Sequence, residues 1–247
     1  MKKIILILLL SLLTLTFSFA QNIGINADGT LPNSSAMLDV KSTTKGFLPP
    51  RMDSTQRNAI ASPATGLTIY NTSINAFQVF NGSLWYSTVH FIGENYGGGI
   101  VFFVYDNGQH GLIAASADDP AARRWNNLVN RYTGTSGDGL NSGSGNTTLI
   151  VATQTGDNQP GNFAARTCAD YSVTVGDVTY GDWYLPAKYE LNLLYLQKNL
   201  VGGFSNLSYW SSNEFDDALG WGQNFGNGDP VIMFKQTSLS VRAVRAF

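Results

Sequence analysis

The feature that constrains the fold most is an amphipathic stretch at residues 187–198, near the end of this 247-residue chain. Its apolar residues recur at intervals of three and four, which places them on one face of a helix: Ala187, Leu191, Leu194 and Tyr195. Pro186 comes just before the stretch, where its missing N–H removes no helical bond, and Gly202 and Gly203 allow the chain to turn after it. The pattern predicts a helix packed on an apolar layer.

Four short runs after this helix predict strands separated by turns. They cover residues 209–212, 220–225, 231–235 and 241–247. In the last run both faces mix valine or alanine with arginine, so at least one arginine needs a partner. We expect Arg242 and Arg245 to pair with Glu190 or Glu214 rather than to contact a ligand. Residues 181–247 therefore predict the core of one compact domain.

The residues before this core predict a hairpin followed by short helices. Strands are expected at 99–105 and 111–115 around an Asp-Asn-Gly turn, followed by a short helix that starts at Asp118 and carries Trp125. A surface loop is expected at 133–145. Two further helices are expected, one at 147–154 that is capped by Asn146 and buries Leu149, Ile150 and Val151, and one at 163–171 that turns Cys168 toward the core. The pattern is that of an α+β domain.

Several ordered motifs carry a resemblance to a known family. They are Trp-Tyr-Leu-Pro at 183–186, the runs 189–195, 209–214, 221–225 and 241–245, and upstream the runs 96–104 and 108–115. Together they resemble the Lcl C-terminal domain family, which is named after the C-terminal domain of a bacterial collagen-like surface adhesin. The resemblance covers residues 91–247 and implies a C-type-lectin-like α+β fold, in which the first and last strands pair and a long loop region forms the variable surface. It implies no particular sugar, because that fold hosts many functions.

The N-terminus has the pattern of a secretory signal. Met1-Lys2-Lys3 precedes the apolar run 4–15, and the small-residue end Ser18-Phe19-Ala20 predicts cleavage before Gln21. The alternatives are a buried N-terminal helix and an uncleaved anchor. The residue after the cleavage point is Gln21 and not a cysteine, which argues against a lipoprotein anchor, and no second apolar stretch is long enough to span a bilayer. We therefore expect residues 1–20 to be removed and the protein to be secreted or held on the outer surface of a Gram-negative bacterium.

Residues 21–90 form a second region, rich in strand and turn patterns. The motifs Gly-Phe-Leu-Pro-Pro-Arg-Met at 46–52, Gln-Arg-Asn-Ala-Ile at 56–60, Gly-Leu-Thr-Ile-Tyr-Asn-Thr at 66–72 and Phe-Asn-Gly-Ser-Leu-Trp at 80–85 recur as a set in short stalk modules, so the region resembles the stalks of exported bacterial surface proteins and tail-fibre-like proteins. A region this short makes a poor core of its own. It either pairs with copies of itself in an oligomeric stalk or forms a small β-meander packed on the C-terminal domain.

Charge and residue usage narrow the function. The net charge is −2 and no cluster of lysine or arginine occurs, which argues against nucleic acid or an anionic membrane as the main partner. A nucleophile–base pair needs a histidine, and only His90 and His110 exist; neither lies beside the one cysteine, Cys168, which occupies a core-facing helical position. No nucleophile elbow, phosphate loop or paired metal motif is present. We expect no enzyme and no cofactor, calcium excepted.

The loops between the closing strands hold the candidate site residues. Oxygen donors on loops are what calcium requires, so the expected metal ligands are Glu214, Asp216, Asp217 and Asp229. The alternative is that aspartate and asparagine only form turns here, because no fixed ligand spacing is present. Trp221, flanked by glycines, is expected to be partly exposed and to contact a ligand together with Asn224 and Asn213, whereas most other tryptophans belong in the core.

Two functions follow from these observations, whereas a third, an enzyme related to the formylglycine-generating group that shares the broad fold, is disfavoured because a lone cysteine supplies no redox pair. The first is an exported adhesin or ligand-binding module that recognises an extracellular glycan, a glycosaminoglycan or a surface protein, with weak sites made effective by repetition on an oligomeric stalk. The second is a structural, non-catalytic cap of a surface fibre.

Overall fold

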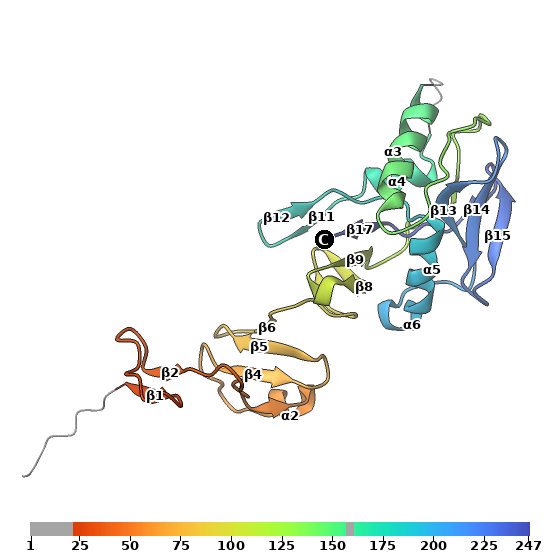
Figure 1. Cartoon of the computed structure of the whole chain (residues 1–247). Helices are drawn as coiled ribbons and strands as arrows, with labels where there is room; N and C mark the ends of the chain where they lie inside the picture. The colour runs from red at the N-terminus through yellow and green to blue at the C-terminus, as the bar shows by residue number, and fades with distance from the viewer. Residues whose placement is uncertain (1–21, 157–160) are drawn as a thin grey trace, which may run out of the picture.

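The computed structural model describes residues 22–156 and 161–247. It is a mixed α+β structure in which strands predominate over short helices, as expected. Figure 1 shows an N-terminal module that extends away from a larger C-terminal domain. The predicted signal at residues 1–20 lies outside the described residues. Within the described part of the chain, no helix combines the length and apolar character needed to cross a bilayer.

The N-terminal module contains two small sheets. Its elements are β1 (Ile23–Ile25), β2 (Leu38–Val40), β3 (Arg51–Met52), α2 (Ser54–Asn58), β4 (Thr68–Asn71), β5 (Ala76–Phe80) and β6 (Trp85–Ser87). β1 and β2 form a parallel pair by themselves, whereas the other strands form a sheet in the order β3-β4-β5-β6. Asp53 caps α2 through a capping box with Gln56. Short strands and little helix agree with the expectation from sequence.

The interior of the β3–β6 sheet is small and partly polar. Ile69 is buried, and so are the amides of Asn71 and Gln78. The Asn71 amide nitrogen donates to Gln78 Oε1 over 2.8 Å, and Arg57 Nη1 donates to the same oxygen over 2.7 Å. This network satisfies the buried amides, but it contributes little apolar burial.

The C-terminal domain opens with the predicted hairpin. β7 (Asn95–Tyr96), β8 (Gly99–Tyr105), the turn η1 (Asp106–Gly108), β9 (His110–Ala115) and the closing strand β17 (Val244–Ala246) form a sheet in the order β17-β9-β8-β7. Asn107 takes a left-handed conformation with φ 53°, and the following Gly108 has φ 80°, which suits an Asn-Gly turn. The last strand therefore lies beside the opening hairpin.

A second sheet carries the other closing strands. β13 (Ser208–Glu214), β14 (Leu219–Asn224) and β15 (Pro230–Phe234) pair in sequence order, with the predicted turns between them. Two further pairs join β10 (Arg123–Arg124) to β16 (Ser238–Leu239) and β11 (Val173–Val175) to β12 (Val178–Tyr180). In Figure 1 the β11–β12 hairpin projects from the domain.

Among its described residues the domain also has four helices: α3 (Ser142–Thr155), α4 (Ala164–Ala169), α5 (Lys188–Leu196) and α6 (Lys198–Val201). The strongly periodic stretch forms α5 as predicted and contacts β8, β13 and β14. α3 begins earlier than predicted, so Asn146 lies inside the helix rather than at its cap, and Leu149 is exposed rather than buried. The short helix predicted around Trp125 is wrong, because β10 occupies that segment and Trp125 is buried next to it.

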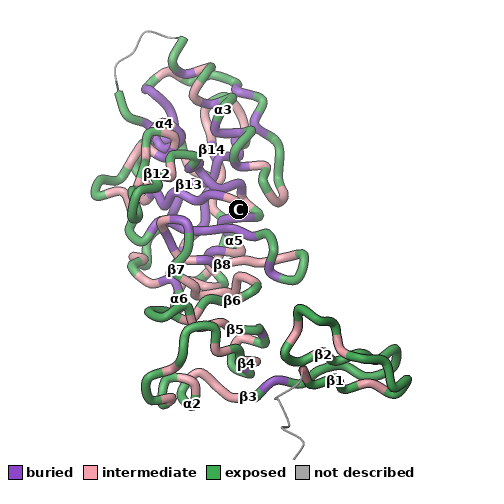
Figure 2. Tube along the Cα trace, turned by 90° about the vertical axis from the view of Figure 1, so that its left-hand side faces the viewer, coloured by how far each residue is buried: buried purple, intermediate pink, exposed green. Residues whose placement is uncertain are grey.

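The C-terminal domain contains the apolar core, as the purple segments in Figure 2 show. One cluster gathers Trp125, Trp183 and Trp210, and the other surrounds Phe102 and Tyr209. The prediction that most tryptophans are core residues is confirmed.

The partners predicted for the arginines of the last strand are wrong. Arg242 binds Asp118, with Nε 2.6 Å from Oδ1, and Arg245 binds Asp182, with Nε 2.7 Å from Oδ1. Both aspartates lie far away in the sequence, and Glu190 and Glu214 are engaged elsewhere in the domain.

Candidate functional site

Trp221 lies on β14 and is half-buried. Its ring meets Phe215 edge to face, with 5.7 Å between the ring centroids, and the Lys188 ammonium lies 4.7 Å from the centre of the Trp221 ring. A cation at this distance from an indole face is attracted by the ring. The partial exposure predicted for Trp221 is therefore observed, with Lys188 against the ring.

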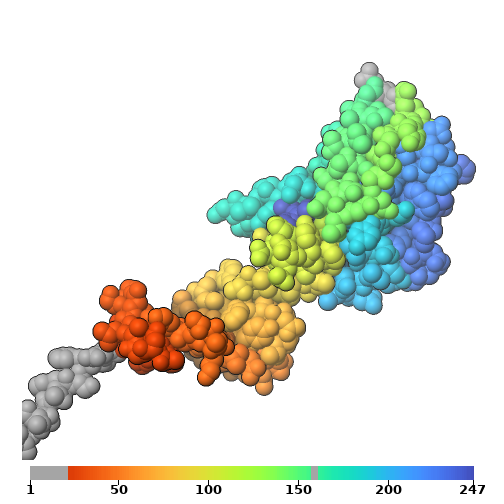
Figure 3. Space-filling model, in the orientation of Figure 1, coloured from red at the N-terminus to blue at the C-terminus, as the bar shows by residue number. Residues whose placement is uncertain are grey.

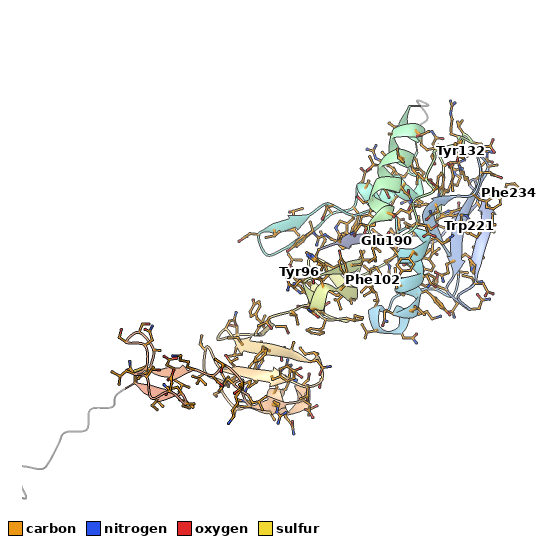
Figure 4. The ribbon with its side chains drawn as sticks, in the orientation of Figure 1. Tyr96, Phe102, Tyr132, Glu190, Trp221 and Phe234 are labelled. Atoms are coloured by element: carbon orange, nitrogen blue, oxygen red, sulfur yellow. The ribbon has the colours of Figure 1, made fainter. Side chains whose placement is uncertain are left out.

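Trp221 belongs to an apolar sheet face that remains open to solvent. Residues opposite one another on antiparallel strands share a face, so Trp221 shares it with Ile232, and the neighbouring pair of Leu219 and Phe234 continues it. Ile232 is 40% exposed and Phe234 67% exposed. Figure 4 shows Trp221 and Phe234 on this sheet at the edge of the domain.

A groove of ≈ 270 Å³ lies between the N-terminal part of α5 and the β14–β15 hairpin. Its lining residues are Asp138, Lys188, Tyr189, Asn192, Gly222, Gln223, Gly228 and Pro230. The Asp138 carboxylate accepts the Tyr189 backbone N–H over 2.7 Å and lies 3.2 Å from the Lys188 ammonium. The only two formal charges that line the groove, among the described residues, thus neutralise each other.

Gln223 supplies a buried polar group to this groove. Its Nε2 donates to Asn192 Oδ1 and to the Gly228 carbonyl oxygen, each over 2.9 Å. Its Oε1 is buried and finds no hydrogen-bond partner among the described residues. Leaving a buried acceptor unpaired costs about 1–3 kcal/mol, so a donor at this position would stabilise the site.

The two predicted asparagine ligands are held within the fold. The Asn213 side chain is buried: its Oδ1 accepts the Lys188 backbone N–H over 2.7 Å and its Nδ2 donates to the Gly137 carbonyl over 2.8 Å. Asn224 lies at the far end of β14, where its Oδ1 accepts the Gly226 N–H. Asn213 therefore positions Lys188 beside Trp221, while Asn224 shapes a turn.

Glu214, the first predicted calcium ligand, forms a buried ion pair. Its carboxylate accepts N–H bonds from Thr133 and Gly134 and lies 2.7 Å from the Lys235 ammonium. The side chain of Glu214 is 3% exposed and that of Lys235 is fully buried. The Lys235 ammonium also donates to the Arg131 carbonyl and lies 4.4 Å from the centre of the Trp125 ring. These contacts occupy the oxygens that a metal ion would need.

The three predicted aspartate ligands do not gather around a common point. Asp216 accepts the backbone N–H groups of Ala218 and Leu219, and Asp229 pairs with the side chain of Asn227 in the next turn. Asp217 is exposed on the first turn. Residues 22–156 and 161–247 contain no group of three or more histidine, cysteine, aspartate or glutamate residues arranged to hold a metal. The aspartates act here as turn formers.

A second buried carboxylate, Glu190, fixes the start of α5. It accepts the backbone N–H groups of Ala187 (2.7 Å), Asn141 (2.8 Å) and Gly143 (3.2 Å), and the Tyr184 hydroxyl over 3.0 Å. Burial raises the pKa of the Glu190 carboxyl, against the opposing effect of these bonds. Figure 4 places Glu190 inside the domain. Glu190 therefore ties the loop that carries Asp138 to the helix that carries Lys188.

The sequence pattern missed most of the residues that line the groove. Lys188 and Asn192 occupy polar positions of the predicted helix, and Asp138 lies in a predicted surface loop. Nothing in their spacing links them, because the contact between loop and helix depends on Glu190. The glycines around Trp221 were the one usable signal.

The comparisons with known proteins give one match, in the N-terminal part of the chain. Residues 24–100 match the model of a family described as a phage tail like trimerisation region. No curated protein matches the chain. The family match supports a tail-fibre-like stalk and homo-oligomerisation through the N-terminal module.

Proposed function

We propose that the protein is an exported surface-fibre protein in which a trimeric stalk presents C-terminal domains that bind an extracellular glycan. The observation that carries the proposal is the parallel β1–β2 pair, whose apolar residues are exposed within a region that matches a trimerisation model. Parallel sheets are normally covered on both faces, and an isolated strand pair is marginally stable. In the proposed trimer, neighbouring copies of the chain pack against the exposed apolar residues of β1 and β2.

The C-terminal domain supports the binding part of this proposal. The motifs that resemble the Lcl C-terminal domain family fall on β13, β14, β17 and α5, and β17 lies beside the opening hairpin. The C-type-lectin-like fold of this domain is likewise proposed on the basis of that resemblance. The half-buried Trp221 and the polar groove beside it combine an aromatic surface with hydrogen-bonding groups, which suits sugar rings. Three weak sites on one stalk would gain affinity through avidity.

We propose a non-catalytic role for the domain. Cys168 is buried in the core, where burial raises the pKa of its thiol and keeps it protonated. His90 lies at the junction between the two regions, with Nδ1 2.9 Å from a Glu94 carboxylate oxygen. The positions of Cys168 and His90 are those of residues that stabilise the fold.

The second candidate function is a structural cap of the fibre. Two of the predicted ligands, Asn213 and Glu214, have their side-chain oxygens engaged by the protein itself, which favours a domain that binds nothing specific. The two candidates share the stalk and differ in whether the Trp221 face binds anything.

Two measurements on the chain from residue 21 test the proposal. Sedimentation equilibrium is expected to give three times the chain mass, and deletion of residues 21–87 is expected to give a monomer. Beads coated with the protein are expected to retain glycans from a broad array in a saturable and selective way. A monomeric parent chain would contradict the stalk, and an empty array from a folded trimer would leave the structural cap as the function.

A further inference from the structure

We infer that the groove between α5 and the β14–β15 hairpin is a calcium-independent subsite for an uncharged sugar ring. The inference rests on the proposed glycan-binding function and names its site, its ligand class and its metal requirement. Nothing in the trimerisation match concerns this groove, which lies at the other end of the chain.

The hydrogen-bonding groups of the groove fit the hydroxyl groups of a sugar. A sugar hydroxyl both donates and accepts, so it is best met by a carboxylate or carbonyl acceptor next to an amide donor. Asp138 provides the carboxylate, with its side chain 31% exposed. Asn192 provides the donor, because its Oδ1 is engaged by Gln223 while its Nδ2 donates to no other described residue. The Oε1 of Gln223, a residue that lines the groove, is buried and unpaired, and a sugar hydroxyl that reached it would supply the missing donor.

The shape of the groove favours one ring. Gly222 and Gly228 contribute backbone only, and Tyr189, 45% exposed, provides an aromatic face at the rim. The volume of ≈ 270 Å³ lies just below the range of about 300–1,000 Å³ that is usual for closed ligand pockets. The groove therefore fits a single ring, and further rings of an oligosaccharide would extend across the neighbouring face of Trp221.

The charges of the groove favour a neutral ligand over a sulfated polysaccharide. The Lys188 ammonium is held between Asp138 and Trp221, so its charge is already compensated. Sulfate groups would need uncompensated lysine or arginine here, whereas an uncharged ring meets no repulsion.

We expect the sugar to bind in this groove without a calcium ion. Asp138 already has an N–H and an ammonium as partners, and the Asp216 and Glu214 carboxylates are engaged outside the groove. The ligand hydroxyls are expected to bind side chains directly.

The test measures binding of the chain from residue 21 to immobilised neutral oligosaccharides of hexose and N-acetylhexosamine rings, with heparin as the anionic comparator, in EDTA and again in calcium. Asp138→Asn keeps an oxygen for the Tyr189 N–H but removes the charge, and Asn192→Ala removes the amide donor. Matched controls are Asp177→Asn, on the exposed turn of the β11–β12 hairpin, and Asn199→Ala on α6. Circular dichroism and sedimentation establish that each variant is folded and oligomeric.

The expected result is binding of at least one neutral oligosaccharide in EDTA, weakened tenfold or more by each groove substitution and less than twofold by each control. Binding that both groove variants retain, binding of heparin alone, or binding that EDTA abolishes would overturn the subsite and leave the proposed glycan-binding function in place. A folded oligomer that binds no saccharide, with or without calcium, would overturn both.

Discussion

In the N-terminal module the apolar residues of β1 and β2 lie on the surface, whereas those of β8 and β9 in the C-terminal domain lie in the core. Of the buried apolar residues in the described part of the chain, the module contributes only Pro49, Ile69 and Ala76. The exposed large apolar residues of the module are Ile23, Ile25, Leu31, Met37, Leu38, Val40, Phe47, Leu48, Phe77, Leu84 and Tyr86. Figure 3 shows the module as a narrow extension from the larger domain.

The exposed apolar residues of the module and the buried ones of the C-terminal domain imply that the two regions are stabilised in different ways. The C-terminal domain has an apolar core within one chain, so we expect its stability to be independent of protein concentration. Many large apolar residues of the module are exposed, and exposed apolar residues that gather on one surface mark an interaction site. The stability of the module is expected to depend on the association of copies, and therefore on concentration.

The largest expected effect is on association through the module. Leu38→Asp places a carboxylate on an exposed apolar strand that we expect to be buried between copies, where an unpaired charge is costly. Sedimentation equilibrium is expected to show the mass falling to that of one chain at micromolar concentration, while tryptophan fluorescence of the C-terminal domain keeps its urea midpoint. Thr44→Asp, on an exposed polar position of the same module, is the control and is expected to leave the mass unchanged. An oligomer that survives Leu38→Asp would place the association surface elsewhere.

The second effect concerns the interior of the C-terminal domain. Lys235→Met removes the ammonium that faces the buried Glu214 carboxylate and leaves that charge unpaired. Removing one partner of a buried pair costs about 3–5 kcal/mol. Urea unfolding is expected to show this loss, and the double variant Lys235→Met with Glu214→Gln is expected to recover part of it. A loss below about 1 kcal/mol, the value typical of a surface pair, would contradict the assigned burial.

Local patterns predicted the elements whose residues pack according to their own periodicity. The spacing of Leu191 and Leu194 predicts α5 correctly, and the Asp-Asn-Gly turn predicts the β8–β9 hairpin. The cap of α3 shows why other boundaries failed. Asn141, before α3, makes no side-chain cap bond, and the N–H of Gly143 is satisfied instead by Glu190, 47 residues later. A cap supplied from that distance leaves no signal in the local sequence.

The same limit applies to the candidate site. Asp118-Asp119-Pro120 is a helix start signal, yet the segment that follows is extended because Trp125 is buried and its indole N–H donates to the Ser211 carbonyl over 2.9 Å. Asp216 and Asp229 lie at turns and bind residues two or three positions away. The partners of Glu214, in contrast, are distant in the sequence: Thr133 and Lys235. Residue type predicts which groups need partners, and tertiary contacts decide which partners they find.

The third prediction uses the other buried carboxylate. Glu190→Gln places an amide NH₂ against backbone N–H groups, at a cost of about 1–3 kcal/mol per unsatisfied donor. Burial raises the pKa of Glu190 above its ordinary value of 4.5, so the folded state binds a proton more readily than the unfolded state. The stability that this group contributes is therefore fully present below pH 4.5 and is lost as the pH rises through the folded pKa.

Urea unfolding of wild type and Glu190→Gln between pH 4.5 and 8 checks this sign. The difference in free energy of unfolding between the two proteins is expected to be largest at the acidic end and to shrink as the pH rises. Asp182, whose pKa is lowered by its bond to Arg245, contributes equally to both proteins and cancels. A difference that grows with pH would show that the hydrogen bonds to the carboxylate outweigh its burial.

The smallest effect is expected from an ion pair of the same chemistry in the module. The Lys41 ammonium lies 2.8 Å from an Asp28 carboxylate oxygen, nearly the same distance as in the pair of Lys235 and Glu214, but the side chains of Lys41 and Asp28 are 59% and 49% exposed. Water already solvates both charges, and salt screens their attraction. Lys41→Met is therefore expected to leave both the oligomer mass and the urea midpoint unchanged at 150 mM salt. A measurable shift in the mass, with the midpoint constant, would mean that Lys41 and Asp28 become buried between copies, which would extend the association surface to the loop between β1 and β2.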